Sequence, residues 1–272
     1  MNYIIREVAN LGLSANMYGW IGTAAFIIAY IYSLVHGKRM GVPVWKMLIF
    51  IAAVRLWMIL CLNLIYPLLQ YLKENEIFGI TMIVNSIVRV VVFIPLIAWL
   101  LSRIFKMKFS LVSDSIALYL PLFSALAQLS CIFTGCCYGY PCEWGIYSLR
   151  TGQNHFPTPI VETTLTLLIF GYLASRVKGK KYISDGTLFP QMMILYGIMR
   201  FICELLRNNQ KIFFGCSGVA LHAVLISVVG AVWLLILSRK KEKSYGNSIQ
   251  TLEAKEGEVG KDPEGSQGGE GC

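Results

Sequence analysis

The stretch TGCCYGYPCEWGIYSLRTGQNHFPTPIVE, residues 134–162, is the longest interruption in a chain that otherwise passes from one apolar block to the next. It contains three cysteines, four glycines, three prolines and one of the chain's three histidines. Glu162 stands where hydrophobicity resumes. Glycine and proline at this density favour turns over a packed core. We therefore expect the rest of the fold to be built around this segment, and we expect the segment to carry a site.

The composition is that of a protein embedded in a membrane. Of the 272 residues, 56% are hydrophobic and only 14% are charged, and the mean hydropathy is +0.61, whereas soluble domains carry about 25% charged residues. A helix needs about 20 apolar residues to cross a bilayer. The chain is predicted to be an all-α membrane protein with seven transmembrane helices. The apolar blocks are Met17–Val35, Val44–Leu72, Phe78–Phe105, Ser115–Phe133, Ile160–Ala174, Leu188–Leu206 and Val219–Leu237.

The net charge of +9 is distributed in a pattern that indicates topology. Basic groups follow the first, third, fifth and seventh blocks, and they include Lys38, Arg103, Lys178 and Arg239. The positive-inside rule then predicts an amino terminus outside and a carboxyl terminus in the cytoplasm. Because the surplus is explained in this way, no nucleic-acid partner is expected.

Two regions are predicted from composition. Residues 1–238 form one transmembrane domain, whose first block carries no cleavage pattern and is interpreted as a retained span. Residues 239–272 are polar, rich in glycine and mixed in charge, so a disordered cytoplasmic tail is predicted there.

Eight cysteines are scattered without a repeated metal-ligand spacing, so neither a metal nor a cofactor is expected. Cys136, Cys137, Cys142 and Cys216 fall on the predicted outer side, where disulfides are permitted. The sequence leaves open whether they form.

Charged residues inside the apolar blocks are candidates for function. An ionised side chain near the bilayer centre costs about 2.5–3.5 kcal/mol on insertion scales, so it should face protein or water. Arg55 fits an interhelical pair as well as a functional role, whereas Arg89 is interpreted as functional. Tyr18 stands at the outer end of the first block, where aromatic residues also form interfacial belts.

The sixth block carries the most informative pattern. Arg200, Glu204 and Arg207 stand at i, i+4 and i+7, which places them on one face of a helix. Arg200 and Glu204 can neutralise each other as an i, i+4 pair. Alternatively, the two guanidiniums suit bidentate recognition of a phosphate.

Two helix starts precede the candidate site. Pro157 and Pro159 are predicted to place Glu162 in the first turn of the fifth helix, where a carboxylate also suits the helix dipole. Ser113 or Asp114 is predicted to cap the fourth helix. The predicted topology gathers the polar candidates in the outer half of the membrane, which favours a cavity that opens outward and accepts a phosphate-bearing lipid headgroup. These candidates are Tyr18, Gln128, Glu162, Arg200 and Glu204.

Four motifs, in order and at matching spacing, resemble the prolipoprotein diacylglyceryl transferase family. The resemblance covers roughly Met17 to Leu237, and the motif in the sixth block is its most specific part. The motifs are Val112-Ser-Asp-x-Ile-Ala, Gly135-Cys-Cys-Tyr-Gly139, Pro157-Thr-Pro-Ile-Val-Glu162 and Gly186-x-Leu-Phe-(x6)-Tyr196-Gly-x-x-Arg200-Phe-x-x-Glu204-x-x-Arg207.

The resemblance implies transfer of a diacylglyceryl group from phosphatidylglycerol or a related phospholipid to the lipobox cysteine of a preprolipoprotein signal peptide, in the bacterial plasma membrane. It implies that Arg200 holds the phosphate and that Glu204 orients it. Position alone suggests His155 as the base and Arg89 as a second positive charge. The predicted catalytic residues are Arg200, Glu204, His155 and Tyr18, and the predicted substrate-binding residues are Arg89, Gln128, Gly135, Cys136, Gly139, Glu162, Tyr196 and Arg207.

The chain departs from the family pattern at several positions. Gln128 stands where the family usually has an arginine, Cys131 replaces an asparagine, and Cys136 replaces a glutamate. The family's third-helix His-Gly-Gly is missing, and residues Asn85 to Arg89 occupy that region. Three alternatives therefore stay open: a divergent enzyme for another lipid or acceptor, a non-catalytic lipid-binding membrane protein and, more weakly, a transporter.

Overall fold

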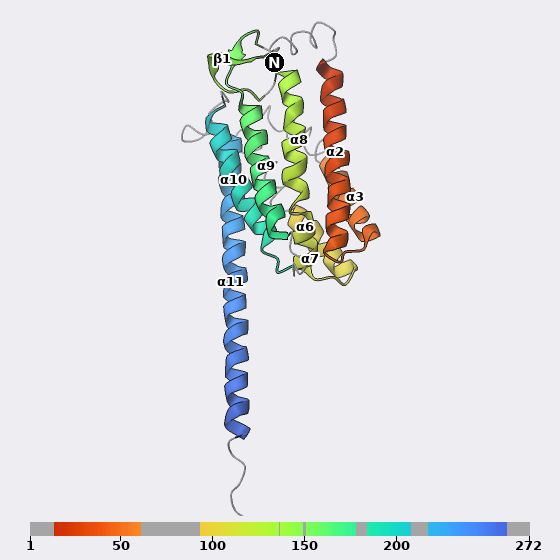
Figure 1. Cartoon of the computed structure of the whole chain (residues 1–272), viewed down its shortest axis with the longest axis vertical. Coiled ribbons are helices and arrows are strands. Elements are labelled where there is room, and N and C mark those ends of the chain that lie inside the picture. Colours follow the sequence, from red (N-terminus) through yellow and green to blue (C-terminus); the bar gives the residue numbers. More distant parts are fainter. Residues whose placement is uncertain are drawn as a thin grey trace, which may run out of the picture.

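The computed structural model describes residues 14–60, 93–135, 137–148, 151–177, 184–207 and 217–259. Helices dominate this part of the chain, and one small antiparallel sheet interrupts them (Figure 1). The helices are α2 (Ser14–Arg39), α3 (Val44–Leu60), α6 (Phe93–Ile104), α7 (Phe109–Ile116), α8 (Tyr119–Thr134), α9 (Thr158–Val177), α10 (Leu188–Leu205) and α11 (Gly218–Val259). The strands are β1 (Pro141–Tyr147) and β2 (Asn154–His155).

Five helical segments of the described residues are long and apolar enough to cross a membrane. Each of the seven predicted apolar blocks contains a helix, but the second and third extend into residues 61–92, outside the described part. The chain is thus a largely helical, multi-pass membrane protein. Its orientation in the membrane stays a prediction.

The helices form a bundle in which successive long helices alternate in direction (Figure 1). α8 lies between α2 and α9, and α10 and α11 lie together at one side. The sheet covers one end of the bundle, and α2 and α9 both end at the other. Basic residues occupy the last turns of these two helices, among them Arg39 and Arg176. The antiparallel pair β1 and β2, called the hairpin from here on, therefore lies at the end of the bundle opposite to these basic helix ends.

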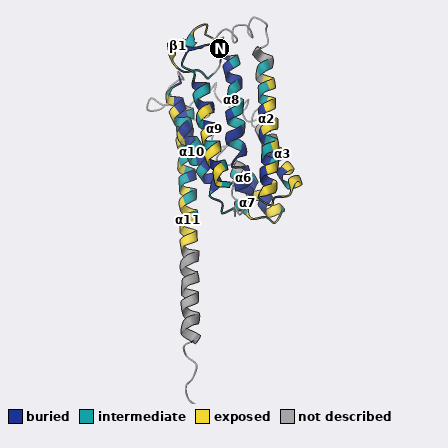
Figure 2. Ribbon diagram, viewed as in Figure 1, coloured by how far each residue is buried: buried dark blue, intermediate teal, exposed yellow. Residues whose placement is uncertain are grey.

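The buried apolar core joins the helices below the hairpin. Phe50, Ala98, Ile116 and Phe189 are nearly inaccessible and belong to one cluster. Figure 2 shows buried residues on the inner faces and exposed residues on the outer faces, α2 above all. Since those exposed residues include many large apolar side chains, the outward surface suits contact with lipid.

Glycines allow α10 and α11 to approach closely. A Cβ added to Gly197 would lie 2.6 Å from the Ala223 carbonyl oxygen and even closer to Ser227 Oγ, and one added to Gly230 would lie 2.8 Å from the Pro190 carbonyl oxygen. Small residues at helix contacts are the usual device for close packing in membranes.

Asp114 caps a different helix from the one predicted. It lies inside α7, and its carboxylate accepts hydrogen bonds from the backbone N–H groups of Gly186 (2.9 Å), Leu188 (3.1 Å) and Phe189 (3.3 Å). These groups belong to the start of α10, whose first N–H groups have no partner within the helix. The prediction that Asp114 caps the fourth span is wrong because a distant helix supplies donors that its own helix does not.

The segment before α10 is also tied to α11. Asp185 accepts a hydrogen bond from Lys241 Nζ at 2.6 Å, and another from the Thr187 hydroxyl at 2.6 Å. Partial burial acts to raise the pKa of the Asp185 carboxyl, but the hydrogen bonds from Lys241 and Thr187 hold it below its usual value. The junction therefore stays charged at neutral pH.

α11 continues beyond the bundle to Val259, so residues 239–259 are helical where a disordered tail is predicted (Figure 1). Lysine, glutamate, alanine and leucine are good helix formers, and a helix that already exists can be extended without a new nucleation cost. Residues 260–272 lie outside the described part.

Close packing at Gly197 gives the first prediction. Gly197→Ala should lower the free energy of unfolding by about 1–3 kcal/mol, because the added methyl group overpacks the contact with α11. The measurement is the thermal unfolding midpoint of the purified protein in detergent. The matched control is Gly171→Ala in α9, where an added Cβ meets no described atom within 4 Å. Equal midpoints for the two variants would contradict the packing role.

Candidate functional site

Glu162 is the centre of the site, and it is fully buried. Its carboxylate accepts hydrogen bonds from Arg200 Nη1, from Arg207 Nη2 and, at 2.6 Å, from Gln128 Nε2. Arg200 belongs to α10, Arg207 lies two residues beyond the end of α10, and Gln128 belongs to α8. Since α9 begins at Thr158, Glu162 lies beyond the first turn, and the prediction that it sits in that turn is wrong. Its partners are side chains, so the site, and not the helix dipole, explains it.

Glu204 supplies a second carboxylate to the same two arginines. Its Oε2 lies 3.6 Å from Arg200 Nη2 and 3.7 Å from Arg207 Nη1, and its Oε1 accepts a hydrogen bond from Ser217 Oγ at 2.8 Å. The predicted i, i+4 pairing of Arg200 with Glu204 is confirmed. Two positive and two negative groups balance, and buried charges are tolerated when they are paired and hydrogen-bonded in this way.

Arg200 is the most accessible of these four groups. Its side chain is 17% exposed, compared with 5% for Arg207, 1% for Glu204 and 0% for Glu162. A molecule that approaches the cluster would therefore meet the Arg200 guanidinium first.

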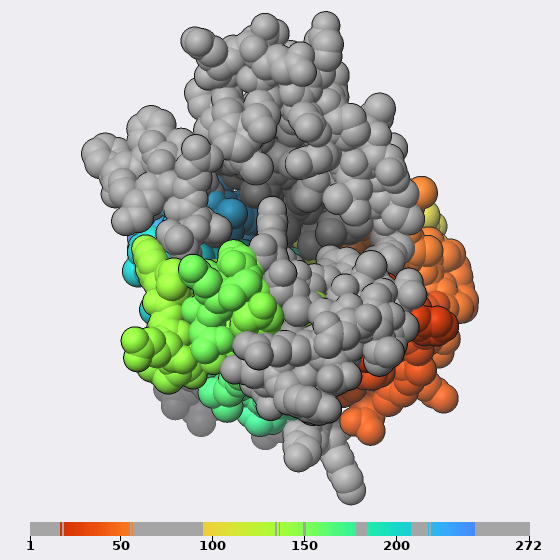
Figure 3. All heavy atoms as spheres, turned by 90° about the horizontal axis from the view of Figure 1, so that it is seen from above, coloured from red at the N-terminus to blue at the C-terminus, as the bar shows by residue number. Residues whose placement is uncertain are grey.

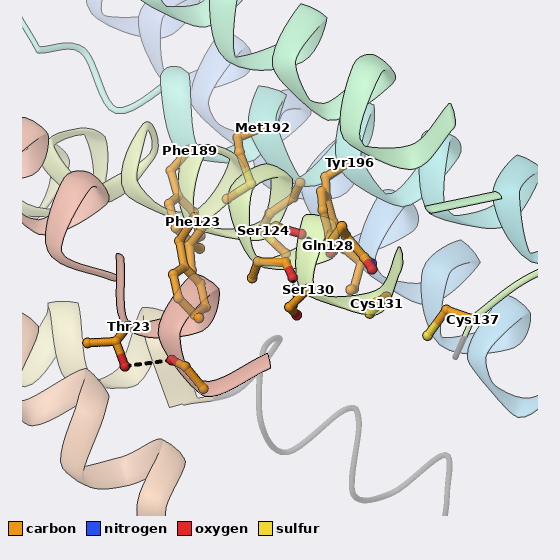
Figure 4. A pocket seen from close by; sticks show the side chains of 16 residues that line it. Thr23, Phe123, Ser124, Gln128, Ser130, Cys131, Cys137, Phe189, Met192 and Tyr196 are labelled. Carbon is orange, nitrogen blue, oxygen red and sulfur yellow. Dashed lines mark hydrogen bonds between the residues drawn. The ribbon is translucent and has the colours of Figure 1, made fainter. Parts of the chain in front are cut away.

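A cavity of about 590 Å³ lies between α2, α8 and α10 (Figure 4). One end is apolar, with Phe123, Phe189 and Met192, whereas the other holds Gln128 and Cys137 (Figure 4). The volume is typical of pockets that enclose small molecules. An amphipathic molecule matches this change in polarity along the cavity.

Gln128 links the cavity to the charge cluster. It lines the cavity, and its amide donates to the same Glu162 oxygen that accepts from Arg200 Nη1. The Tyr196 hydroxyl also lines the cavity, 3.2 Å from Ser124 Oγ. Arg200 is not among the residues that line this cavity, but it shares the Glu162 oxygen with Gln128, which does.

The hairpin holds the end of α10 in place. The backbone of Gly139 forms an isolated antiparallel β-bridge with the backbone of Arg207, and a Cβ at Gly139 would lie 2.5 Å from the Leu206 carbonyl oxygen. Gly135 ends α8 with a left-handed conformation at a φ of 65°, which glycine adopts without strain. Figure 3 looks down on this end, with the green hairpin on one side of the molecule and α2 and α3 on the other. Gly139 thus lies directly against the backbone that carries Arg207.

His155 fastens the same hairpin. Its Nδ1 lies 2.9 Å from the Gly139 carbonyl oxygen, and its Nε2 lies 2.7 Å from Thr151 Oγ1. A carbonyl oxygen only accepts, so Nδ1 donates to Gly139. His155 is buried and is not among the residues that line the cavity.

Residues 6–237 match the family model described as prolipoprotein diacylglyceryl transferase. The chain belongs to this family. A phosphatidylglycerol–prolipoprotein diacylglyceryl transferase of Symbiobacterium thermophilum is 29% identical over 143 residues, which cover 48% of this chain and 53% of that protein. The enzyme of the same name from Streptococcus uberis is 26% identical over 94 residues, covering 35% of this chain and 36% of that protein.

A third relative aligns over most of its length. The enzyme of the same name from Clostridioides difficile is 25% identical over 240 residues, or 86% of this chain and 94% of that protein. In the first two matches the chain spans about half or less of the relative. Family membership and the long apolar helices together indicate a multi-pass bacterial membrane protein.

Several residues predicted for this diacylglyceryl transferase family site lie outside the described part. Arg89 and Cys136 are among them, as is the side chain of Tyr18, although the α2 backbone is described there. Cys142 carries a free thiol, Cys137 also lies in the described part, and Cys136 and Cys216 lie outside it.

The structure adds residues that sequence reasoning missed. Ser124 stands four residues before Gln128 on the same face of α8, so helical spacing could have found it. Ser217 binds Glu204 from outside α10, and no local pattern indicates that contact. Gly19 and Gly22 of α2 line the cavity, which their spacing alone does not indicate.

The buried cluster gives the second prediction. Glu162→Gln should lower the free energy of unfolding by about 3–5 kcal/mol, because it removes a buried charge that both arginines require. Equilibrium unfolding in detergent measures the effect. The control is Glu143→Gln on the exposed part of β1, which should change stability little. A Glu162→Gln protein as stable as the control would show that the cluster does not hold the helices together.

Proposed function

We propose that the protein transfers a diacylglyceryl group from phosphatidylglycerol to the lipobox cysteine thiol of preprolipoproteins, in the bacterial plasma membrane. Membership of the family supports this proposal, as do the names of its relatives. The observation that carries it is the amphipathic cavity, whose polar end is joined to two arginines through Gln128 and Glu162.

The donor lipid would lie in the cavity with fatty chain and polar part at opposite ends. Phe123, Phe189 and Met192 offer an apolar surface to a chain. Gln128 and Tyr196 offer polar groups at the level of the glycerol esters. The cavity would enclose only part of a two-chain lipid, and the remainder would extend into the bilayer.

Arg200 would bind the phosphate of the lipid. Its guanidinium is the most exposed charge of the cluster, and its planar donors match phosphate oxygens. Glu162 and Glu204 would hold the guanidinium in one orientation, so that it is preorganised to bind the phosphate. Arg207, more deeply buried, would add positive field behind it.

The reaction would join sulfur to carbon. The thiolate attacks the glycerol carbon that carries the phosphate ester, the carbon–oxygen bond breaks, and its electron pair stays on the departing glycerol phosphate. Arg200 would stabilise the charge that develops on this phosphate. The thiol must lose its proton to a base, and an unperturbed thiol has a pKa of about 8.5. His155 remains the proposed base, and its Nε2 would have to exchange Thr151 for the thiol.

Replacement of Arg200 tests the proposal. We would incubate purified protein with phosphatidylglycerol in detergent micelles and a lipobox peptide. Mass spectrometry then measures how much of the peptide has gained the mass of a diacylglyceryl group. Arg200→Gln should lower turnover by about 10²–10³-fold, the usual effect of removing one group that stabilises developing charge. Arg176→Gln, at the end of α9, is the control and should keep full turnover.

The outcomes separate the alternatives. A folded Arg200→Gln protein with unchanged turnover would contradict the role of the arginine. Wild-type protein that modifies the peptide only with another lipid would indicate a divergent transferase. Lipid binding without any modification would indicate a non-catalytic member of the family.

A further inference from the structure

Two glycines of α2 leave open space beside the cavity. Gly19 and Gly22 line it, and a Cβ added to either would meet no described atom within 4 Å. They are one helical turn apart and therefore lie on one face of the helix. This arrangement is the opposite of that at Gly197, where an added Cβ would strike α11.

Among the described residues, no neighbour gives Gly19 and Gly22 the packing role that explains Gly197 and Gly230. A glycine in a helix costs about 0.5–1 kcal/mol relative to alanine, so two of them one helical turn apart, neither with a described atom within 4 Å of an added Cβ, favour a role in keeping space. That space is the cavity.

The neighbouring polar group of α2 is turned to its own helix. Thr23 Oγ1 donates to the Gly19 carbonyl oxygen at 2.8 Å (Figure 4). Figure 4 draws Thr23 at the same end of the cavity as Phe123 and Phe189, and Cys137 at the other end. The α2 wall thus faces the apolar end, and a hydrocarbon chain is the chemistry that suits it.

We propose that the Gly19–Gly22 face of α2 sets the width of the apolar end of the cavity. One fatty chain of the bound lipid would lie in this part of the cavity, called the slot, and its width would select the shape of that chain. The inference rests on the proposed function, because it takes the cavity as the donor-lipid site. With hydrogen in place of a side chain at two successive turns, the slot accepts a chain with a cis double bond, which is bent and wider than a straight chain. A larger residue at Gly22 would leave room for the straight chain and exclude the bent one.

The experiment compares two phosphatidylglycerols of identical composition. One carries two oleoyl chains, which are bent, and the other carries their straight trans isomers. For each protein the ratio of kcat/KM for the bent donor to that for the straight donor is measured with the lipobox peptide. Gly22→Leu should lower this ratio about tenfold, because a small steric mismatch in an apolar pocket changes kcat/KM by about this factor. Gly22→Ala should lower it less.

The control is Ala24→Leu, which adds similar bulk to an exposed residue of the same helix that does not line the cavity. Its ratio should equal that of the wild type. Thermal unfolding midpoints establish that each variant is folded. If Gly22→Leu does not fold, Gly22→Ala is used as the test variant in its place. An unchanged ratio in the folded Gly22 variants, or an equal loss with both donors, would overturn the inference.

A second readout separates this inference from the proposed function. If wild-type protein transfers neither lipid, the proposed function fails, and binding of the same two lipids is then compared by native mass spectrometry. Selective loss of the bent lipid in Gly22→Leu would still support a chain-selecting wall. Equal binding of both lipids would overturn it.

Discussion

One buried carboxylate holds three helices in register. Glu162, carried by α9, is reached by an amide from α8 and by two guanidiniums from α10 and its end. An isolated charge is costly away from water, so these donors must be in place together. Because Arg207 is also bridged to Gly139, the same interaction fixes the hairpin over the end of the bundle. Two of the helices that Glu162 joins, α8 and α10, also form walls of the cavity.

The four charged residues of the site have no net charge together. Arg200 and Arg207 are balanced by Glu162 and Glu204, so the bundle carries no uncompensated charge from these four residues in the absence of ligand. An anionic headgroup near Arg200 would compete with Glu162 for its donors and leave Glu204 and Arg207 to adjust.

Much of the architecture could be predicted from residue patterns, because apolar length, helical spacing and glycine-rich interruptions are local properties. The face shared by Arg200 and Glu204 followed from 3.6-residue periodicity. The partners of Glu162, the distant helix that Asp114 caps and the hydrogen bond of His155 to Gly139 join segments far apart in the sequence, which local spacing does not encode. The length of α11 was missed because its lysines and glutamates were interpreted as disorder, although they extend a helix that already exists.

The cap that Asp114 gives to α10 links the far end of the bundle to the cavity. Leu188 and Phe189 receive that cap through their backbone, and the Phe189 side chain belongs to the apolar wall. A displacement of α7 would release the first turn of α10 and loosen this wall. During membrane insertion, α10 should therefore acquire its final first turn only after α7 has docked, so the final shape of the cavity should form late in assembly.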